Sequence, residues 1–207
     1  MIRRMLRRYR EANANRVLAR ELHNTFRETG AIFIHVPKAA GSSISLELFG
    51  HQVGHFTVMD WFARDPLLTE RLFKFAFVRE PLDRLHSAWR FLRAGGMNAG
   101  DAETGARLAA TFDDFVAQLV ADATLQRWIH FLPQHHFLCA PDTRLLVDFV
   151  GRFEKMEADF ARVAARLGKD VQLSVRNPSP AAPLAASDRT RKLVRDLYEA
   201  DYQMFGY

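Results

Sequence analysis

Three short apolar runs, separated by amphipathic segments, organise this chain. Residues 31–36, 75–78 and 145–150 are rich in Ile, Val, Phe and Leu. Runs of this length and composition are typical of strands that are buried on both faces of a parallel sheet. Since helical segments follow the runs, the pattern predicts an α/β fold: a three-layer sandwich with a central parallel sheet flanked by helices. Ligands of such sheets bind at the carboxyl ends of the strands.

Apolar residues recur at helical spacing in four other segments. These are residues 81–92, 112–120, 152–167 and 188–204. In the first of them, Leu82, Leu85, Trp89 and Leu92 are three, four and three residues apart and therefore share one face of a helix. Two segments interrupt the pattern. The glycine-rich residues 94–107 are expected to form a flexible loop, and residues 177–186, rich in Pro and Ala, a linker.

The segment after the first apolar run has the composition of a phosphate-binding loop. Lys38, Gly41, Ser42 and Ser43 follow Pro37 within six positions, and an apolar segment then begins a helix. In a strand–loop–helix unit, the loop N–H groups and the positive end of the helix dipole point at one position. The loop differs from a Walker A motif because its lysine precedes the glycine. The sequence therefore predicts a P-loop-like site for a nucleotide phosphate.

A second strand–helix unit carries further anion-binding groups. Arg79 ends the second apolar run, and Ser87 lies on the helix that begins near Pro81, where Arg84 shares its face. An arginine at a strand end and a hydroxyl on the next helix can hold a second anionic group. The second unit therefore predicts a site for a second anionic group.

These two units resemble the cofactor-binding motifs of sulfotransferases that use 3′-phosphoadenosine 5′-phosphosulfate (PAPS). Residues 37–43 (P-K-A-A-G-S-S) resemble their 5′-phosphosulfate loop, and residues 75–87 (F-A-F-V-R-E-P-L-D-R-L-H-S) their 3′-phosphate motif. The similarity is greatest to the carbohydrate O-sulfotransferases of the heparan and chondroitin type and their bacterial relatives. It continues through Pro133-Gln134 and residues 147–154 to residues 201–207. The resemblance implies one sulfotransferase domain over residues 1–207, with a basic helix at 1–28 and the family-like region at 31–207.

The resemblance also implies roles for individual residues. The 5′-phosphosulfate would be held by Pro37, Lys38, Ala39, Ala40, Gly41, Ser42 and Ser43. Arg79 and Ser87 would hold the 3′-phosphate, and Lys38 would also be catalytic, because it would neutralise charge on the departing phosphate. The family needs no metal for this transfer. Two positions depart from the family pattern: Ala39 replaces a common threonine, and Glu80 replaces Asn or Asp and places a carboxylate next to Arg79.

The acceptor hydroxyl needs a base, and an imidazole with an ordinary pKa near 6.5 suits that task. His55 follows Gly54 between the two units and resembles the Gly-His of heparan 2-O-sulfotransferases, where the histidine is the catalytic base. His51, Glu47 and Asp60 are the alternatives.

Five other histidines have different expected places. His35 is expected to be a core residue of the first strand, and His86 to point away from Ser87. His130, His135 and His136 surround Pro133-Gln134 and are candidates for lining an acceptor pocket. Zinc is not expected, because the histidines lack a nearby carboxylate or cysteine in a known ligand pattern.

The net charge of +5 is concentrated at the N-terminus. Seven arginines lie in the first twenty residues: Arg3, Arg4, Arg7, Arg8, Arg10, Arg16 and Arg20. They are expected on one helix that also carries Leu18, Leu22 and Phe26 and docks on the domain by that apolar edge. The alternative is contact with a membrane surface beside a lipid-linked acceptor. Nucleic acid is not an expected partner, and a polyanionic sugar would explain part of the basicity.

The single cysteine, Cys139, excludes an intramolecular disulfide and fits a reducing compartment. No apolar run approaches the roughly 20 residues of a membrane-spanning helix, and the N-terminus lacks the apolar region of a secretory signal. We therefore expect a cytoplasmic, bacterial enzyme, with peripheral contact at the inner membrane face as an option.

The sequence thus predicts transfer of a sulfuryl group from PAPS to a hydroxyl of a carbohydrate or glycolipid. Two alternatives stay open. One is a P-loop-type kinase or nucleotide hydrolase, against which the order of lysine and glycine argues. The other is a non-catalytic nucleotide- or membrane-binding module that uses the basic N-terminus.

Overall fold

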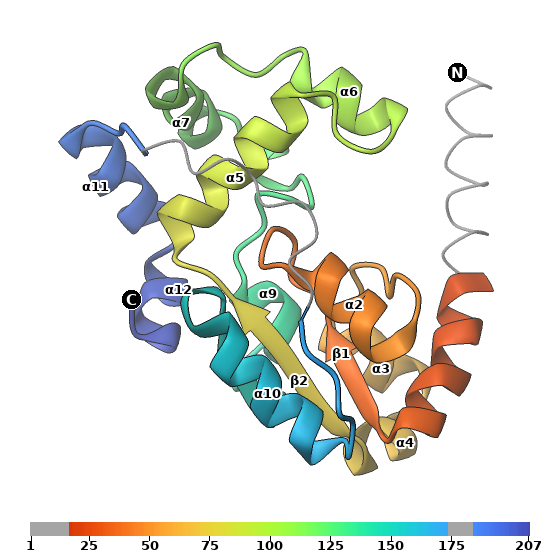
Figure 1. Ribbon diagram of the computed structural model, residues 1–207. Coiled ribbons are helices and arrows are strands. Elements are labelled where there is room, and N and C mark those ends of the chain that lie inside the picture. The colour runs from red at the N-terminus through yellow and green to blue at the C-terminus, as the bar shows by residue number, and fades with distance from the viewer. Residues whose placement is uncertain (1–16, 174–183) are drawn as a thin grey trace.

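The computed structural model describes residues 17–173 and 184–207 (Figure 1). Six of the seven N-terminal arginines, Arg3 to Arg16, and most of the predicted linker at 177–186 lie outside these residues. A helix covers residues 17–29. The strands and helices after it are β1 (Ala31–Ile34), α2 (Gly41–Phe49), α3 (Val58–Arg64), α4 (Pro66–Arg71), β2 (Phe73–Val78), α5 (Pro81–Arg93), α6 (Ala99–Gly105), α7 (Phe112–Ala121), α8 (Ala123–Gln126), α9 (His135–Leu138), β3 (Phe149–Arg152), α10 (Met156–Arg166), α11 (Asp188–Leu197) and α12 (Glu199–Phe205).

The three strands form one parallel sheet in the order β1-β2-β3. Ile34 is level with Ala76, and Val78 is level with Arg152. Because the strands run in one direction, the loop after β1, Arg79 after β2 and the end of β3 meet at the same edge of the sheet. The parallel α/β sheet that the sequence predicts is confirmed.

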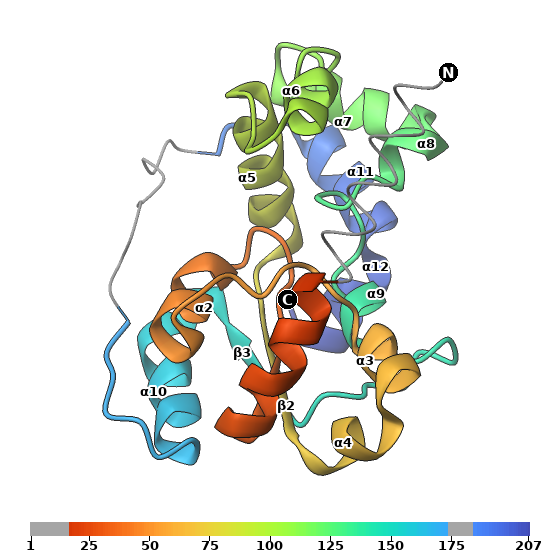
Figure 2. The same ribbon diagram turned by 90° about the vertical axis from the view of Figure 1, so that its right-hand side faces the viewer.

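Helices cover both faces of the sheet, as Figures 1 and 2 show from two sides. Helices α2 and α10 lie on one face, and α3, α4 and α9 lie on the other. The helix at 17–29 lies beside β1 and buries Leu22 and Phe26 in the core, while Arg20 is exposed. The described part of the N-terminal helix therefore docks on the domain by the apolar edge that its sequence predicts.

A second hydrophobic cluster lies beyond the carboxyl ends of the strands, where α5, α7 and α11 pack together (Figure 1). The apolar face of α5 contributes Leu82, Leu85 and Leu92, which are buried as predicted, and Trp89 packs against their cluster. The helix at 112–120 is also confirmed, as α7.

The single closing helix predicted for 188–204 is wrong, because the chain turns at Tyr198 between α11 and α12. Tyr198 is wholly buried and its hydroxyl donates to the carbonyl of Phe131. The turn directs Asp201 towards Gln134 and His135. Its carboxylate accepts hydrogen bonds from their backbone N–H groups, at 2.7 and 2.9 Å. A buried N–H group without an acceptor costs about 1–3 kcal/mol, so the bond from Gln134 to Asp201 favours this turn.

Three other predicted segments differ from the structure. Residues 94–107 are not a flexible loop, because α6 lies within them and Asn98 caps its start by accepting from the N–H of Asp101. The third strand begins at Phe149, not at residue 145; Leu145 forms only an isolated bridge with Cys139. The helix predicted over 152–167 begins at Met156, after a short 3-10 turn. In the part of the chain that the structure describes, no helix has the length and apolarity needed to span a bilayer.

Candidate functional site

The loop between β1 and α2 turns by means of two left-handed residues. Lys38 has φ 68° and Ala40 has φ 61°, although neither is glycine. Such a residue costs roughly 1–2 kcal/mol, so the surrounding structure must hold it in place. Left-handed residues alternating with ordinary ones turn successive N–H groups towards one centre, which is the geometry of an anion-binding nest. Ser42 and Ser43 lie in the first turn of α2, one exposed and one half-buried.

Gly41 is required by the histidine beneath this loop. A Cβ at Gly41 would lie 1.9 Å from Cδ2 of His35, which is closer than any real contact. His35 follows β1 directly and is 6% exposed, and its Nδ1 has no hydrogen-bond partner among the residues that the structure describes. It is a buried residue, as expected, but it supports the phosphate loop and is not saturated with hydrogen bonds.

The ammonium group of Lys38 lies 3.9 Å from the centre of the Phe91 ring on α5. Burial is the main cause that lowers the pKa of Lys38 to about 8, and the charge of Arg79 acts in the same direction, while Asp101 opposes them. Lys38 is therefore mainly protonated at neutral pH. A cation held against an aromatic face and partly desolvated interacts strongly with an incoming anion.

The guanidinium of Arg79 lies next to the loop. Its Nη1 donates to the carbonyl of Lys38 at 3.4 Å, which brings the two sequence units together. Asp83 holds its Nε and Nη2, each at 2.7 Å, and Phe153 covers it at 4.0 Å from the ring centre. Ser87, one turn after Asp83 on α5, is half-buried.

Gln134 fixes the backbone of Arg79. The buried amide donates to the carbonyl of Arg79 at 2.8 Å and accepts its N–H at 2.9 Å. The backbone of Gln134 is held in turn by Asp201. The Pro133-Gln134 motif therefore supports the arginine, a role that the sequence reasoning did not assign to it.

Two charged residues of the second unit have structural partners away from a phosphate. The carboxylate of Glu80 accepts the N–H of Asp83 and the hydroxyl of Tyr202, so Asp83, not Glu80, pairs with the Arg79 side chain. Arg84 is wholly buried and donates to the carbonyls of His130 and Leu132.

His55 lies beside the loop in a fixed tautomer. Its Nδ1 is 3.0 Å from the carbonyl oxygen of His35, and because a carbonyl only accepts, Nδ1 carries the hydrogen. Nε2 then carries the lone pair. Burial is the largest cause that lowers the pKa of His55, so the ring is neutral at pH 7. Among the described residues Nε2 has no hydrogen-bond partner, and a half-buried neutral imidazole of this kind can accept a proton.

The alternative bases are placed differently. His51 is hydrogen-bonded to Thr25 of the helix at 17–29, at 3.1 Å. Asp60 is exposed and forms a capping box with Thr57 at the start of α3. Glu47 lies half-buried on α2.

The remaining histidines divide into two groups. His130 is brought near His55, with ring centres 6.2 Å apart. His135 is paired with Asp201 at 2.7 Å and His136 is exposed, while His86 stacks on Trp89. Of the histidines around Pro133-Gln134, then, only His130 approaches the base candidate. Within residues 17–173 and 184–207, no three His, Cys, Asp or Glu side chains are grouped to hold a metal ion.

Three residues that the sequence reasoning missed complete the site: Asp83, Phe91 and Asp101. Asp83 carries a detectable signal, because it is four residues after Arg79 and pairs with it across the start of α5. Phe91 and Asp101 meet Lys38 and His130 only through the packing of α5 and α6.

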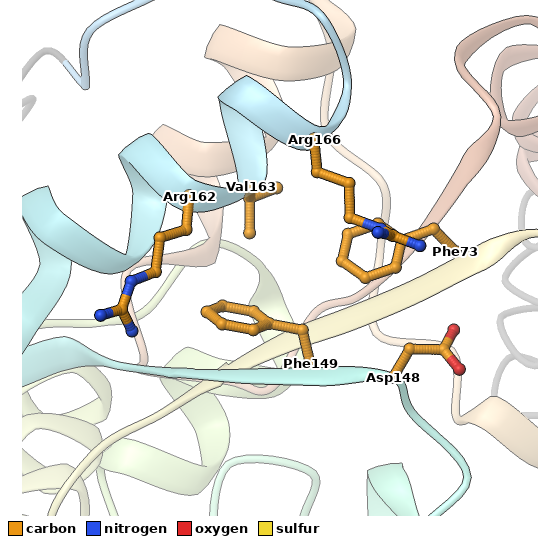
Figure 3. Close-up of a pocket in the computed structure, with 6 residues that line it drawn as sticks. All are labelled: Phe73, Asp148, Phe149, Arg162, Val163 and Arg166. Atoms are coloured by element: carbon orange, nitrogen blue, oxygen red, sulfur yellow. The ribbon is translucent and has the colours of Figure 1, made fainter.

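A cavity of about 320 Å³ lies elsewhere, at the amino-terminal end of the sheet (Figure 3). Phe73 and Phe149, near the starts of β2 and β3, line it with Arg162, Val163 and Arg166 of α10. Lys38 and Arg79 lie at the carboxyl ends of the strands, so this cavity is not part of the candidate site.

Comparison with known proteins places the chain in a family. The model of the sulfotransferase family matches residues 23–207. Carbohydrate sulfotransferase 14 of Homo sapiens is 31% identical over 165 residues, which cover 67% of this chain and 43% of that protein. The Mus musculus protein of that name is 30% identical over 165 residues, with the same coverage, and the Danio rerio protein 31% over 113, or 46% of this chain and 30% of that protein. The chain thus spans less than half the length of these relatives. No solved structure matches it. Since the family match covers residues 23–207, which include both predicted phosphate-binding units, this chain belongs to the sulfotransferase family.

Proposed function

We propose that this chain transfers the sulfuryl group of PAPS to a hydroxyl of a carbohydrate or glycolipid. The observation that carries the proposal is the contact between the two anion-binding units, where Arg79 donates to the backbone of Lys38. One nucleotide that carries phosphates at two positions can engage both units at once. ATP has no group for the second unit, which argues against a kinase.

The residues have distinct tasks in the transfer. The loop N–H groups with Ser42 and Ser43 bind the 5′-phosphosulfate, and Arg79 with Ser87 binds the 3′-phosphate. The acceptor oxygen attacks sulfur and gives its proton to Nε2 of His55, while the bond from sulfur to the phosphate oxygen breaks and its electron pair leaves with the phosphate. Lys38 stabilises the negative charge that grows on that oxygen. In transfers of phosphoryl-type groups between two oxygen atoms, positioning and fixed charges of this kind supply most of the catalysis.

The carbohydrate acceptor is supported by the similarity to proteins named carbohydrate sulfotransferase 14. The likeness covers 43% of those relatives, so the acceptor is proposed at the level of the class.

The test is transfer of labelled sulfate from PAPS to a panel of cell-envelope glycans, glycolipids and small phenols. Transfer to glycans or glycolipids supports the proposal. If phenols are the only good acceptors, the carbohydrate assignment is wrong. If phosphate passes from ATP to the same panel and sulfate does not pass from PAPS, the sulfotransferase activity itself is wrong.

We also propose a cytoplasmic location, with the basic N-terminus as a contact to the inner membrane face. Fractionation of cells that make the full chain, and of cells that make a form with the seven N-terminal arginines changed to glutamine, tests this. Recovery of both forms in the soluble fraction would remove the membrane contact from the proposal.

A further inference from the structure

A buried carboxylate lies beside the candidate site. Asp101 is 4% exposed, and its side chain is held within α6. Carboxylates are rarely buried this completely unless charged or hydrogen-bonding partners surround them. Gly96 passes so close to it that a Cβ there would lie 2.1 Å from Cβ of Asp101. Asp101 is therefore in a defined position.

Glycines of the 94–107 segment also allow this placement. At the end of α6, a Cβ on Gly105 would lie 1.9 Å from the carbonyl oxygen of Leu92. α6 can thus press directly against the backbone of α5. The glycines that suggest a mobile loop in the sequence are instead needed for close packing of Asp101's helix on the helix that carries Phe91.

The two carboxylate oxygens of Asp101 have different partners. Oδ2 accepts from the N–H of Met97 and from the side-chain amide of Asn98, at 3.1 and 3.0 Å. Oδ1 faces Nε2 of His130 at 3.5 Å. The backbone carbonyl of His130 is itself fixed by the buried Arg84. Asp101 and His130 therefore form a buried pair between α6 and the turn before α9.

His130 connects this pair to the reacting groups. Its ring lies edge-on to His55 at 6.2 Å and to Phe91 at 5.2 Å. Phe91 also contacts the Lys38 ammonium, which lies 3.9 Å from its ring centre. The His130 ring thus lies between Asp101 on one hand and His55 and Phe91 on the other, and Phe91 is the ring that contacts Lys38.

The charge of Asp101 acts on the same two groups. It raises the pKa of Lys38 against burial and Arg79, and it raises the pKa of His55 against burial and Lys38. The other ionisable rings near them, His35 and His130, have pKa values lowered by burial and are neutral at pH 7, that of His130 to about 4. Asp101 is thus the buried negative charge that acts on Lys38 and His55, whereas Arg79 is paired with Asp83.

We propose that Asp101 is a positioning residue of the site. It orients His130 against His55 and Phe91, and it supplies a buried negative charge that stabilises the positive charges of Lys38 and of His55 once His55 is protonated. The inference rests on the proposed function. When His55 takes the acceptor proton at Nε2, a second full charge forms near Lys38. A fixed carboxylate at Asp101 stabilises that imidazolium, and it also keeps Lys38 protonated for the departing phosphate.

The test is the pH dependence of kcat/KM for PAPS in Asp101→Asn, which keeps the size of the side chain and removes its charge. Activity requires neutral His55 on the acidic limb and protonated Lys38 on the alkaline limb. Because Asp101 raises both pKa values, its neutralisation should move both limbs to lower pH. The rate at pH 9, relative to the rate at the optimum, should fall by roughly two- to fivefold. Asp114→Asn, an exposed residue in the first turn of α7, is the matched control and should keep the wild-type profile.

A second readout does not depend on activity. NMR titration of the His55 ring in the ligand-free protein should show a lower pKa in Asp101→Asn than in the wild type. If the wild type transfers no sulfate to any acceptor, the proposed function fails, and this titration still decides the role of Asp101. If transfer is normal and neither limb nor the His55 titration moves, the function stands and the inference is overturned.

A variant that does not fold is also informative. Asp101→Ser removes the charge without adding volume and serves where Asp101→Asn is unstable. Asp101→Glu keeps the charge and should leave both limbs in place. If both neutral variants fail to fold, the carboxylate is needed for the structure alone, and the proposal is overturned.

Discussion

The Nδ1 atom of His55 lies 3.0 Å from the carbonyl oxygen of His35, the residue that follows β1. The end of the first strand thus sets the tautomer of a histidine twenty residues later. The same His35 ring lies against Gly41, so one residue contacts both the predicted phosphate loop and the base candidate. A disturbance at His35 would therefore reach the two parts of the reaction together.

Replacing His55 with Ala should lower kcat by roughly 10²–10⁴, because the acceptor proton loses its base. Affinity for adenosine 3′,5′-bisphosphate, the product of the donor, should change little. In the wild type, activity should fall as the pH drops through the pKa of His55; burial lowers that pKa, so the acidic limb should lie below pH 6.5. The variant should lack this limb. His51→Ala is the control, and a His55→Ala enzyme that works at the wild-type rate would exclude His55 as the base.

Replacing Lys38 with Ala should lower turnover by roughly 10²–10³, the usual loss for one preorganised charge-stabilising group. Bisphosphate binding should weaken less, because Arg79 and the loop N–H groups remain. In the wild type, kcat/KM for PAPS should fall above a pH of about 8, where the free enzyme loses the Lys38 proton. Lys38→Arg keeps a cation at higher pH and should shift that limb upwards. Full activity of Lys38→Ala would show that the loop only binds.

Adenosine 3′,5′-bisphosphate should raise the melting temperature much more than AMP does, because only the bisphosphate engages Arg79 and Ser87. At a hundred times its Kd, a ligand adds roughly 2.7 kcal/mol to the free energy of unfolding. Arg79→Ala should remove most of the difference between the two nucleotides. Arg107→Ala, an exposed arginine paired with Glu103, should keep it. Equal shifts with AMP and the bisphosphate in the wild type would contradict the two-unit site.

Replacing Gln134 with Ala should destabilise the protein and weaken bisphosphate binding together. The buried amide satisfies both the N–H and the carbonyl of Arg79, and one buried group left without a partner costs about 1–3 kcal/mol. Denaturant unfolding and bisphosphate titration measure the two effects. Gln203→Ala, which removes an exposed amide paired with Glu199, is the control. A Gln134→Ala protein of reduced stability with unchanged bisphosphate affinity would show that the hydrogen bonds of Gln134 do not position Arg79 for the ligand.

Local pattern determined the parts of the fold that are continuous in sequence. The apolar runs of β1 and β2, and the loop and helix that follow each, appear where the sequence predicts them. A strand and an amphipathic helix each have a period that a short segment shows, and Gly and Pro mark the turns between them. Lys38, Arg79 and Ser87 could be named as anion-binding candidates from their places in these units, whereas His55 was named from the resemblance of Gly54-His55 to a family motif. The third strand is less well predicted, since Asp148 turns its carboxylate to the N–H of Lys74 just before β3 begins.

Only the tertiary structure decided which distant residues surround those candidates. Gln134 bonds to Arg79 across 55 residues of sequence. Asp101 contacts His130 from α6, a helix that the glycines of residues 94–107 made look like a loop in the sequence. A glycine that permits close packing has the same sequence signature as one that loosens a loop, and only the neighbouring atoms distinguish them. The break at Tyr198 has a similar origin, because a buried hydroxyl bond to Phe131 outweighs a helical pattern that would otherwise continue. Burial and long-range hydrogen bonds, which no local period encodes, therefore complete the site.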